Sequence, residues 1–513
     1  MSERAKGVRI EVLRDLLKEA QEEGLTTTSE VCNGLIKPRT EEKQCAYVDT
    51  LPSDLVADAT VFVSHAWRYD LADSVDVMEQ YEAEHPGSVF WFDLVMNSQH
   101  GVEERPFEWW CHTFQHSIEQ IGTVVLVLAP WSSPIPLTRS WCLFEIMCSL
   151  NAGREKVDFQ IRLPAKQEEH FVSSMCKRSD GALKALVGVK TEASEAHLQS
   201  DRENIFKAVE ATIGFQKLNT MVNNHMRDWF LDQGLRAVQQ LEPLVKRSKD
   251  ELQAASSSNS NSDSKSDSNS DSNSDSNSDN NSDNTEVSYA SRCHQFANML
   301  SSFGQHARAL SFYQRALDIR RAVLGEENVY TADTYNNMVV LLSTLGRYDE
   351  ALEASSKARA IYSSLFGEDH ADTAGTYHNS ALVYRAKGMY KEALENYHKA
   401  LGILLKVNGE ECANTATTYS NIALVLDRLG EHEQALEHYN KALAIRHKVL
   451  GEDHPDTAGA YNNIANVYDS LGRFKDALAC YARALAIRQR VFGDDHPDTA
   501  ATYNNMAVTH KLQ

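Results

Sequence analysis

One carboxylate and several aromatic and polar residues occupy positions from which they could act together on a ligand. Trp141 and Glu145 are four residues apart in a predicted helix, so we expect them to share one face of it. A carboxylate beside an aromatic ring can hold a flat ring and stabilise positive charge on an attached ribose. The other candidate ligand-binding residues, each at or just after the end of a predicted strand, are Ser64, His65, Trp67, Asp93 and Trp131.

A predicted parallel sheet must position these candidates. Apolar runs of strand length occur at 60–64, 88–93, 123–129, 157–161 and 186–190. Helical stretches, for example 73–84 and 108–121, lie between them. Continuous apolar strands that alternate with helices indicate a doubly wound α/β domain whose parallel sheet is covered on both faces. Ligands of such domains bind beyond the carboxyl ends of the strands, where the candidates lie.

Two runs of residues indicate a family resemblance: Val-Phe-Val-Ser at 61–64 and Ser-Trp-Cys-Leu-Phe-Glu-Ile from Ser140 to Ile146. The first is similar to the first strand of the Toll/interleukin-1 receptor (TIR) domain, and the second to the Ser-x-Trp-Cys-Leu-x-Glu-Leu run of its plant members. The resemblance covers residues 59–215. The loop 97–101, Asn-Ser-Gln-His-Gly, departs from the Arg-Asp or Pro-Gly signature that the family usually carries after its second strand.

The TIR resemblance implies two alternatives for Glu145. In the catalytically active branch of the family, the glutamate of this run cleaves NAD+ at the nicotinamide–ribose bond. Glu145 would then be the catalytic carboxylate, with Trp141 stacking on a ring of the dinucleotide. NAD+ would be a substrate, and no cofactor would be required. Other members are catalytically silent adaptors that act by association of like domains, and Glu145 would then be a structural or solvated carboxylate.

A Ser/Asn/Asp tract divides the chain in two. Residues 256–284 contain almost no apolar side chain, so we expect a disordered linker. The predicted domains are a lead-in at 1–58 with an amphipathic helix over 7–24, the TIR-like domain at 59–215, a helical extension at 216–255, the linker at 256–286 and a repeat array at 287–513.

The C-terminal half repeats every 42 residues. Tyrosines, glycines and two sets of alanines recur at this interval, for example at Tyr461, Gly472, Ala477 and Ala484. Small residues at fixed points allow two antiparallel helices to pack closely, and the glycine provides the turn between them. The pattern resembles the tetratricopeptide repeat in the long-unit form of kinesin light chains, and it predicts an α-solenoid of five helix pairs and a final single helix.

One asparagine follows each repeat tyrosine by two residues. This position lies off the apolar stripe, so we expect it to face the concave groove of the solenoid, where a side-chain amide can pair with the backbone of an extended protein or peptide ligand. The alternative is that these residues cap or bond neighbouring helices. They are Asn337, Asn379, Asn421, Asn463 and Asn505.

Composition excludes several other functions. The net charge of −21 argues against binding to nucleic acid or to an anionic membrane. The nine cysteines are scattered and never spaced as metal ligands, so we predict no metal site and a reducing, cytoplasmic compartment. No glycine-rich phosphate loop is present. We therefore expect a signalling scaffold that binds a protein partner through its repeats and associates through its TIR-like domain. The alternative is an NAD+ glycohydrolase.

Overall fold

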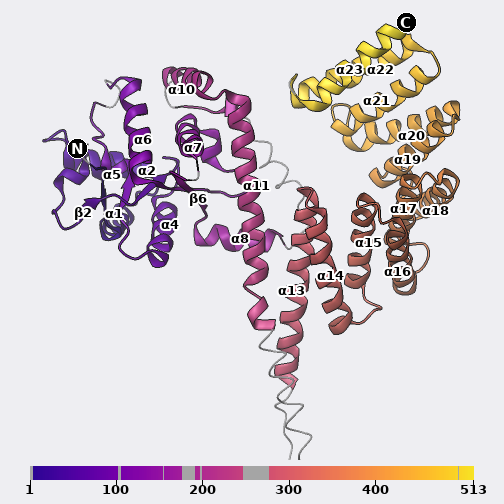
Figure 1. Cartoon of the computed structure of the whole chain (residues 1–513), viewed down its shortest axis with the longest axis horizontal. Helices are drawn as coiled ribbons and strands as arrows, with labels where there is room; N and C mark the ends of the chain where they lie inside the picture. The colour runs from indigo at the N-terminus through magenta and orange to yellow at the C-terminus, as the bar shows by residue number, and fades with distance from the viewer. Residues whose placement is uncertain are drawn as a thin grey trace, which may run out of the picture. The chain divides into compact units, whose positions relative to one another are not determined.

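The computed structural model describes residues 4–101, 105–153, 155–175, 191–196, 199–245, 276–494 and 496–513. The chain divides into two compact units, Met1–Ala237 and Val238–Gln513 (Figure 1). The first unit, called the α/β unit below, contains the sheet, and the second contains the helical array. No helix in the described part of the chain is long and apolar enough to cross a bilayer.

The α/β unit is built on a mixed sheet in which strands follow the order β2-β1-β4-β3-β5-β6. Pairs β3–β4, β3–β5 and β5–β6 are parallel, whereas β1 is antiparallel to both β2 and β4. The strands are β1 (Lys6–Val8), β2 (Val56–Asp58), β3 (Val61–Ser64), β4 (Phe90–Phe92), β5 (Thr123–Val127) and β6 (Asp158–Arg162). The first four predicted parallel strands are therefore present, and they support an α/β class.

Helices cover both faces of this sheet. Alternate residues of a strand point to opposite faces, so Val61 and Val63 enter the core shared with α1 (Ile10–Glu22) and α4 (Leu71–Glu84). Between them, Phe62 stacks on Trp91 at 4.5 Å and meets Phe114 of α6 (Phe107–Ile121) on the other face. The remaining helices of the unit are α2 (Thr28–Val31), α3 (Lys37–Thr40), α5 (Asp93–Met96), α7 (Ser140–Ala152), α8 (Ala165–Met175), α10 (Gln199–Thr212) and α11 (Phe215–Gln239).

The lead-in differs from the predicted helix over 7–24. Its first residues form β1, and α1 begins only at Ile10. Gly7 permits this pairing, because a Cβ atom there would lie 2.8 Å from the carbonyl oxygen of Phe90. The lead-in therefore contributes a strand to the sheet and a helix to its core. The fifth predicted strand, 186–190, lies outside the described residues.

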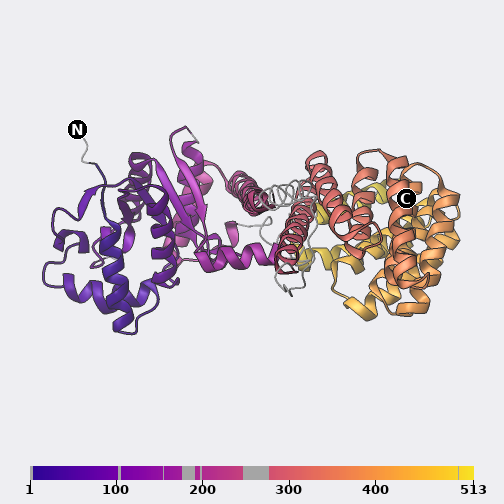
Figure 2. The same ribbon diagram turned by 90° about the horizontal axis from the view of Figure 1, so that it is seen from below.

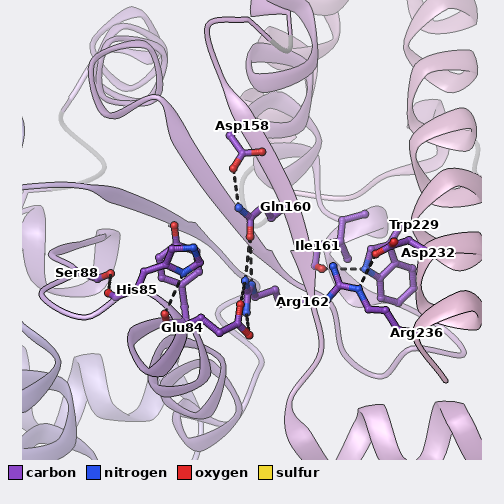
Figure 3. Close-up of polar contacts among 11 residues, drawn as sticks. Glu84, His85, Ser88, Asp158, Gln160, Ile161, Arg162, Trp229, Asp232 and Arg236 are labelled. Carbon is purple, nitrogen blue, oxygen red and sulfur yellow. Dashed lines mark hydrogen bonds and ion pairs between the residues drawn. The ribbon is translucent and has the colours of Figure 1, made fainter. Parts of the chain in front are cut away.

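Helix α11 packs beside β6 (Figure 3). The indole Nε1 of Trp229 donates a hydrogen bond of 2.9 Å to the carbonyl oxygen of Ile161. The guanidinium of Arg162 makes two hydrogen bonds, of 2.9 and 2.8 Å, to the carboxylate of Glu84 at the end of α4. These contacts fix the last described strand of the sheet between α4 and α11.

The array consists of helix pairs that follow one another along the chain, from rose through orange to yellow in Figures 1 and 2. Alanines at the crossing points, such as Ala351 and Ala477, are completely buried, so paired helices pack closely. Gly472 has a φ of +70° in the turn between α21 and α22, a conformation that favours glycine. The pairs are α13 (Ser276–Ser302) with α14 (His306–Leu324), α15 (Val329–Thr344) with α16 (Tyr348–Phe366), α17 (Ala371–Ala386) with α18 (Tyr390–Asn408), α19 (Ala413–Arg428) with α20 (His432–Leu450), and α21 (Pro455–Ser470) with α22 (Phe474–Phe492); α23 (Pro497–Leu512) follows alone.

The predicted linker is only partly described. Residues 276–286 begin helix α13, so this end of the Ser/Asn/Asp tract is helical. Residues 256–275 lie outside the described part of the chain.

Candidate functional site

Polar residues from three elements meet at the carboxyl ends of the parallel strands. Ser64 is the last residue of β3, Asp93 directly follows β4, and Glu145 lies on α7, which follows β5. The parallel strands run β4-β3-β5-β6, so the chain order reverses between β3 and β5. Open α/β sheets bind ligands at such a switch point. We call Ser64, His65, Asp93, Cys142 and Glu145 the switch-point cluster.

Glu145 is a buried acid within this cluster. Its side chain bonds directly to Ser64, whose hydroxyl donates to Oε2. The residue is only 7% exposed. The pKa of Glu145 is raised to about 8, chiefly by burial and also by the nearby charge of Asp93, whereas the hydrogen bond from Ser64 lowers it. Glu145 is therefore mainly a neutral acid at pH 7, and it becomes an anion only as the pH rises.

His65 and Asp93 form the second pair of the cluster. Asp93 Oδ1 lies 3.6 Å from His65 Nδ1, and Asp93 Oδ2 accepts a 2.6 Å hydrogen bond from the indole of Trp67. Burial lowers the pKa of His65, although Asp93 opposes this shift. Within the described ranges, His65 Nε2 and Asp93 Oδ1 have no hydrogen-bond partner. The pair is thus a neutral ring beside a carboxylate that retains an unused oxygen.

Cys142 completes the cluster; it was not among the predicted site residues, because its sequence context favoured a small buried cysteine over a nucleophile, and it is buried. Its thiol donates a 3.4 Å hydrogen bond to the carbonyl oxygen of His65. Burial raises the pKa of this thiol well above its usual value, so it is not a reactive thiolate. Its position beside Trp141 in the sequence was the only available signal, and it does not reveal this contact.

Two predicted site residues lie apart from the switch-point cluster. The indole of Trp141 donates to Asp201 at 3.1 Å, and its ring lies 5.6 Å from that of Phe107. Trp131 donates to His170 at 3.1 Å and packs on Phe171. Trp141 and Glu145 therefore make their polar contacts with different elements, although they are four residues apart on α7. The physical reason is that the indole reaches a carboxylate of α10 and aromatic rings of α6, whereas the carboxyl group is directed toward β3.

The five predicted groove asparagines lie on the first helices of four successive pairs and on the single helix α23. Four of them hydrogen-bond to the residue 43 positions earlier, on the preceding first helix, and we call this series the asparagine ladder. The hydrogen bonds from asparagine Nδ2 run from Asn337 to His294 Nε2 (3.0 Å), from Asn379 to Asn336 Oδ1 (2.9 Å), from Asn421 to His378 Nε2 (3.2 Å) and from Asn505 to Asn462 Oδ1 (3.3 Å). Asn463 occupies the same position on α21.

The ladder connects the first helices to one another, as one of the two alternatives anticipated. Each of these bonds uses the amide nitrogen of the asparagine. Among the hydrogen bonds of the described residues, none uses the amide oxygens of the five ladder asparagines. The ladder is therefore structural through its amide nitrogens.

Comparison with known families identifies the array. Residues 292–513 match the family model described as "Tetratricopeptide repeat" in five overlapping stretches, 292–364, 330–406, 372–448, 414–489 and 456–513. The predicted tetratricopeptide repeats are thus confirmed, over somewhat less than half of the chain. No curated protein matches this sequence.

Several solved structures are similar to part of the chain. BtubC (BKLC) from P. vanneervenii is 25% identical, with a TM-score of 0.37, over 42% of this chain and 84% of its own. A putative kinesin light chain from Podosopora anserina, with nearly identical TPR-like repeats, is 21% identical, with a TM-score of 0.36, over 40% of this chain and 98% of its own. MamA is 19% identical, with a TM-score of 0.28, over 38% of this chain and 95% of its own.

Proposed function

We propose that this protein is a cytoplasmic signalling scaffold. Its tetratricopeptide repeats capture a protein or an extended peptide, and its α/β unit, as a TIR-like domain, gives the output by associating with copies of itself. The observation that carries the first half is the row of amide oxygens left by the asparagine ladder. Regular acceptors along one face suit the repeating donors of a peptide backbone.

Two further observations support the second half and the location. The parallel strands run in the doubly wound order 2-1-3-4, and the helix that carries the Ser140–Ile146 run follows the third of them. The eight cysteines in the described part of the chain are free thiols, which suits a reducing compartment.

Peptide selection on the full chain tests the capture step. A displayed library of random twelve-residue peptides is selected, and the affinities of the selected peptides are measured by calorimetry. We expect the triple variant N337A/N379A/N421A to weaken binding by about tenfold or more, because it removes three of the acceptors. A variant of an exposed residue on a second helix, Lys399→Ala, serves as the control. Failure to select any peptide would contradict this function.

Light scattering on the same sample tests the output step. Addition of a selected peptide should raise the average mass of the full chain in a concentration-dependent way. A mass that stays monomeric at every concentration, with and without peptide, would remove self-association from the proposal.

A second candidate function is NAD+ glycohydrolysis with Glu145 as the catalytic carboxylate. The observation that favours it is the position of this carboxyl group beside Ser64 at the switch point of the sheet. In this reaction water adds to C1′ of the ribose as the bond to nicotinamide breaks, and an anion beside C1′ stabilises the oxocarbenium-like transition state. Because the pKa of Glu145 is about 8, the anion becomes abundant only above neutrality.

Nicotinamide release from NAD+ distinguishes this candidate from the scaffold alone. If it is correct, release increases from pH 7 to pH 8.5 in the wild type and is lost in E145Q. The control variant E119Q changes an exposed glutamate of α6 and should retain the activity. Absence of release at both pH values, in dilute and concentrated protein, eliminates the enzymatic function.

A further inference from the structure

Two exposed histidines occupy neighbouring turns of α6. His112 and His116 are four residues apart, so their side chains lie on one face of the helix, and both are exposed to solvent. Of the 19 histidines in the sequence, no other two are separated by three or four residues. The prediction that the chain has no metal site rests on its cysteines, whereas this pair consists of imidazoles alone.

The separation of the two rings suits a shared metal ion. The ring centroids of His112 and His116 are 5.4 Å apart, and the ring planes make an angle of 23°. Two imidazoles bound to one tetrahedral ion through bonds of about 2.0–2.1 Å have their centroids about 5 Å apart. The backbone of α6 therefore holds the two rings at a separation that chelation requires.

One nitrogen of this pair presents a lone pair. Gln120 uses its Oε1 atom to accept a 2.9 Å hydrogen bond from the backbone N–H of Ala5, and this directs its amide nitrogen toward His116. That nitrogen donates a 2.9 Å hydrogen bond to Nε2 of His116. The Nε2 atom is therefore unprotonated, as a metal ligand must be. A metal ion takes the place of the amide N–H as its partner, because the exposed ring is able to turn toward His112.

The composition of the site indicates which ions it takes. Neutral imidazole is a ligand for Zn²⁺, Cu²⁺ and Ni²⁺, whereas Mg²⁺ and Ca²⁺ prefer oxygen. Among the residues that the structure describes, no third histidine, cysteine or carboxylate joins the pair to hold an ion. Water would complete the coordination, so the ion would be exchangeable, unlike that of a structural zinc site with four protein ligands.

The opposite face of α6 connects this pair to the sheet. Phe114 is buried, and its ring lies 6.2 Å from that of Phe62 on β3 and 5.7 Å from that of Trp91 on β4. An ion that bridges His112 and His116 binds the folded helix more tightly than the unfolded chain, because only the helix holds the two rings together. Binding should therefore stabilise α6 and the face of the sheet that it covers.

We propose that His112 and His116 form a surface site for one divalent transition-metal ion that prefers imidazole ligands, with Zn²⁺ as the representative ion. The ion links two successive turns of α6 and stabilises the α/β unit. This inference is independent of the scaffold and NAD+ glycohydrolase functions, because none of the residues assigned to those functions takes part in it.

Calorimetric titration of the full chain with Zn²⁺ tests the site directly, with Mg²⁺ as the contrasting ion. We expect one site per chain that H112N and H116N each weaken by at least about tenfold, because the second ligand of a chelate acts at high effective concentration. Mg²⁺ should not bind there. H398N, which removes an exposed histidine of the array, is the control and should leave this site unchanged. If each single variant retains the wild-type affinity, the histidines bind independently and the shared site is overturned.

A relocated pair distinguishes chelation from a structural effect of either histidine. Glu108 is exposed and lies four residues before His112. The double variant E108H/H116N therefore has two histidines at the same spacing, one turn earlier on α6, and it should recover most of the affinity that H116N loses. A double variant that binds Zn²⁺ no better than H116N would contradict a site that is based on helical spacing.

Tryptophan fluorescence measures the effect of the ion on stability, since all seven tryptophans lie in the α/β unit. Without metal, the thermal midpoints of the wild type, H112N and H116N should agree, because both histidines are exposed. Excess Zn²⁺ should raise the midpoint of the wild type by about 2–4 °C and leave those of the two variants unchanged. An equal shift in all three proteins would place the ion elsewhere, and a wild type that binds Zn²⁺ without any shift would remove the stabilising role.

Discussion

Glu145 makes the stability of the α/β unit depend on pH. Its pKa is about 8 in the folded chain and 4.5 as the ordinary value, so the folded state holds a proton that the unfolded state releases. Stability from this group is complete below pH 4.5 and is lost as the pH rises through 8. We expect E145Q to stabilise the unit at pH 7 by roughly 3 kcal/mol and to have little effect at pH 4.5.

Urea unfolding of the wild type and E145Q at pH 5 and 8 measures this difference. The variant E119Q, in which an exposed glutamate of α6 changes, should follow the wild type at both pH values. A wild type that is equally stable at pH 5 and 8 would show that Glu145 is ionised in the folded chain without cost.

His378 gives the array the opposite dependence on pH. Its Nε2 accepts from Asn421, so its Nδ1 carries the proton and faces the hydroxyl of Thr418. Burial lowers the pKa of His378 to about 4, and the charge of Arg385 adds to this shift. Below about pH 6.5 the histidine therefore binds a proton in the unfolded chain but not in the folded chain. The unfolding free energy falls as the pH decreases from 6.5 toward 4.

Replacement of this histidine should remove the acid sensitivity that it causes. Between pH 7.5 and pH 5 the unfolding free energy of the wild type should fall by about 2 kcal/mol more than that of H378N. Circular dichroism during urea unfolding measures the loss. The exposed His398 of α18, changed to asparagine, is the control and should behave as the wild type. Parallel losses in the wild type and H378N would mean that His378 is protonated at little cost.

At the scale of elements, α11 contributes a specific hydrogen bond to β6. The Trp229 indole donates a 2.9 Å hydrogen bond to the Ile161 carbonyl (Figure 3). Its ring centroid also lies 5.0 Å from that of Phe230. W229F keeps an aromatic ring but leaves a buried carbonyl unpaired, so we expect a loss of about 1–3 kcal/mol in unfolding free energy.

An ion pair on the same helix provides the control for this prediction. Arg236 and Asp232 of α11 are 2.8 Å apart, and both side chains are more than half exposed. R236A should therefore cost less than about 1 kcal/mol. If W229F costs no more than R236A, and both cost less than about 1 kcal/mol, the indole hydrogen bond contributes little to the packing of α11 on β6.

The elements that the sequence predicted are those with strong local patterns. Long apolar runs identified β3 and β5, and the 42-residue repetition identified the helix pairs of the array. The strands β1 and β2 were missed because Lys-Gly-Val and Val-Ala-Asp do not form apolar runs of strand length, and because they pair across about fifty residues of chain, for example Gly7 with Ala57. The side-chain pattern of 7–24 is helical throughout, so only the contact of Gly7 with β4 determines that its beginning is a strand.

The candidate site was predictable to a similar extent. Residues at strand ends were expected to meet, and Ser64, His65 and Asp93 do lie with Glu145 in the switch-point cluster. The directions in which the indoles of Trp141 and Trp131 point were not predictable. Their hydrogen-bond partners, Asp201 and His170, come from helices distant in sequence. Likewise, the 42-residue repeat identified the ladder asparagines in the sequence. Their pairing with residues 43 positions earlier could not be predicted, because it depends on how adjacent first helices lie against each other.

At the scale of the whole molecule, the two units differ in how their contacts are distributed. The sheet of the α/β unit joins segments far apart in sequence, such as β1 and β4, so it should unfold cooperatively. In the array each pair packs mainly on its neighbours, and its stability is approximately a sum of local terms. The units therefore need not unfold together, even within one chain.

The distribution of tryptophan makes this difference measurable in the intact protein. All seven tryptophans lie in the α/β unit, so fluorescence follows that unit alone, while circular dichroism at 222 nm also follows the helices of the array. We expect two transitions on heating the full chain. E145Q at pH 8 should shift only the transition of the α/β unit, which fluorescence detects. H378N at pH 5 should shift only the transition of the array, which circular dichroism alone detects. Single transitions that coincide for both probes, and that move together in either variant, would show that the two units unfold as one cooperative body.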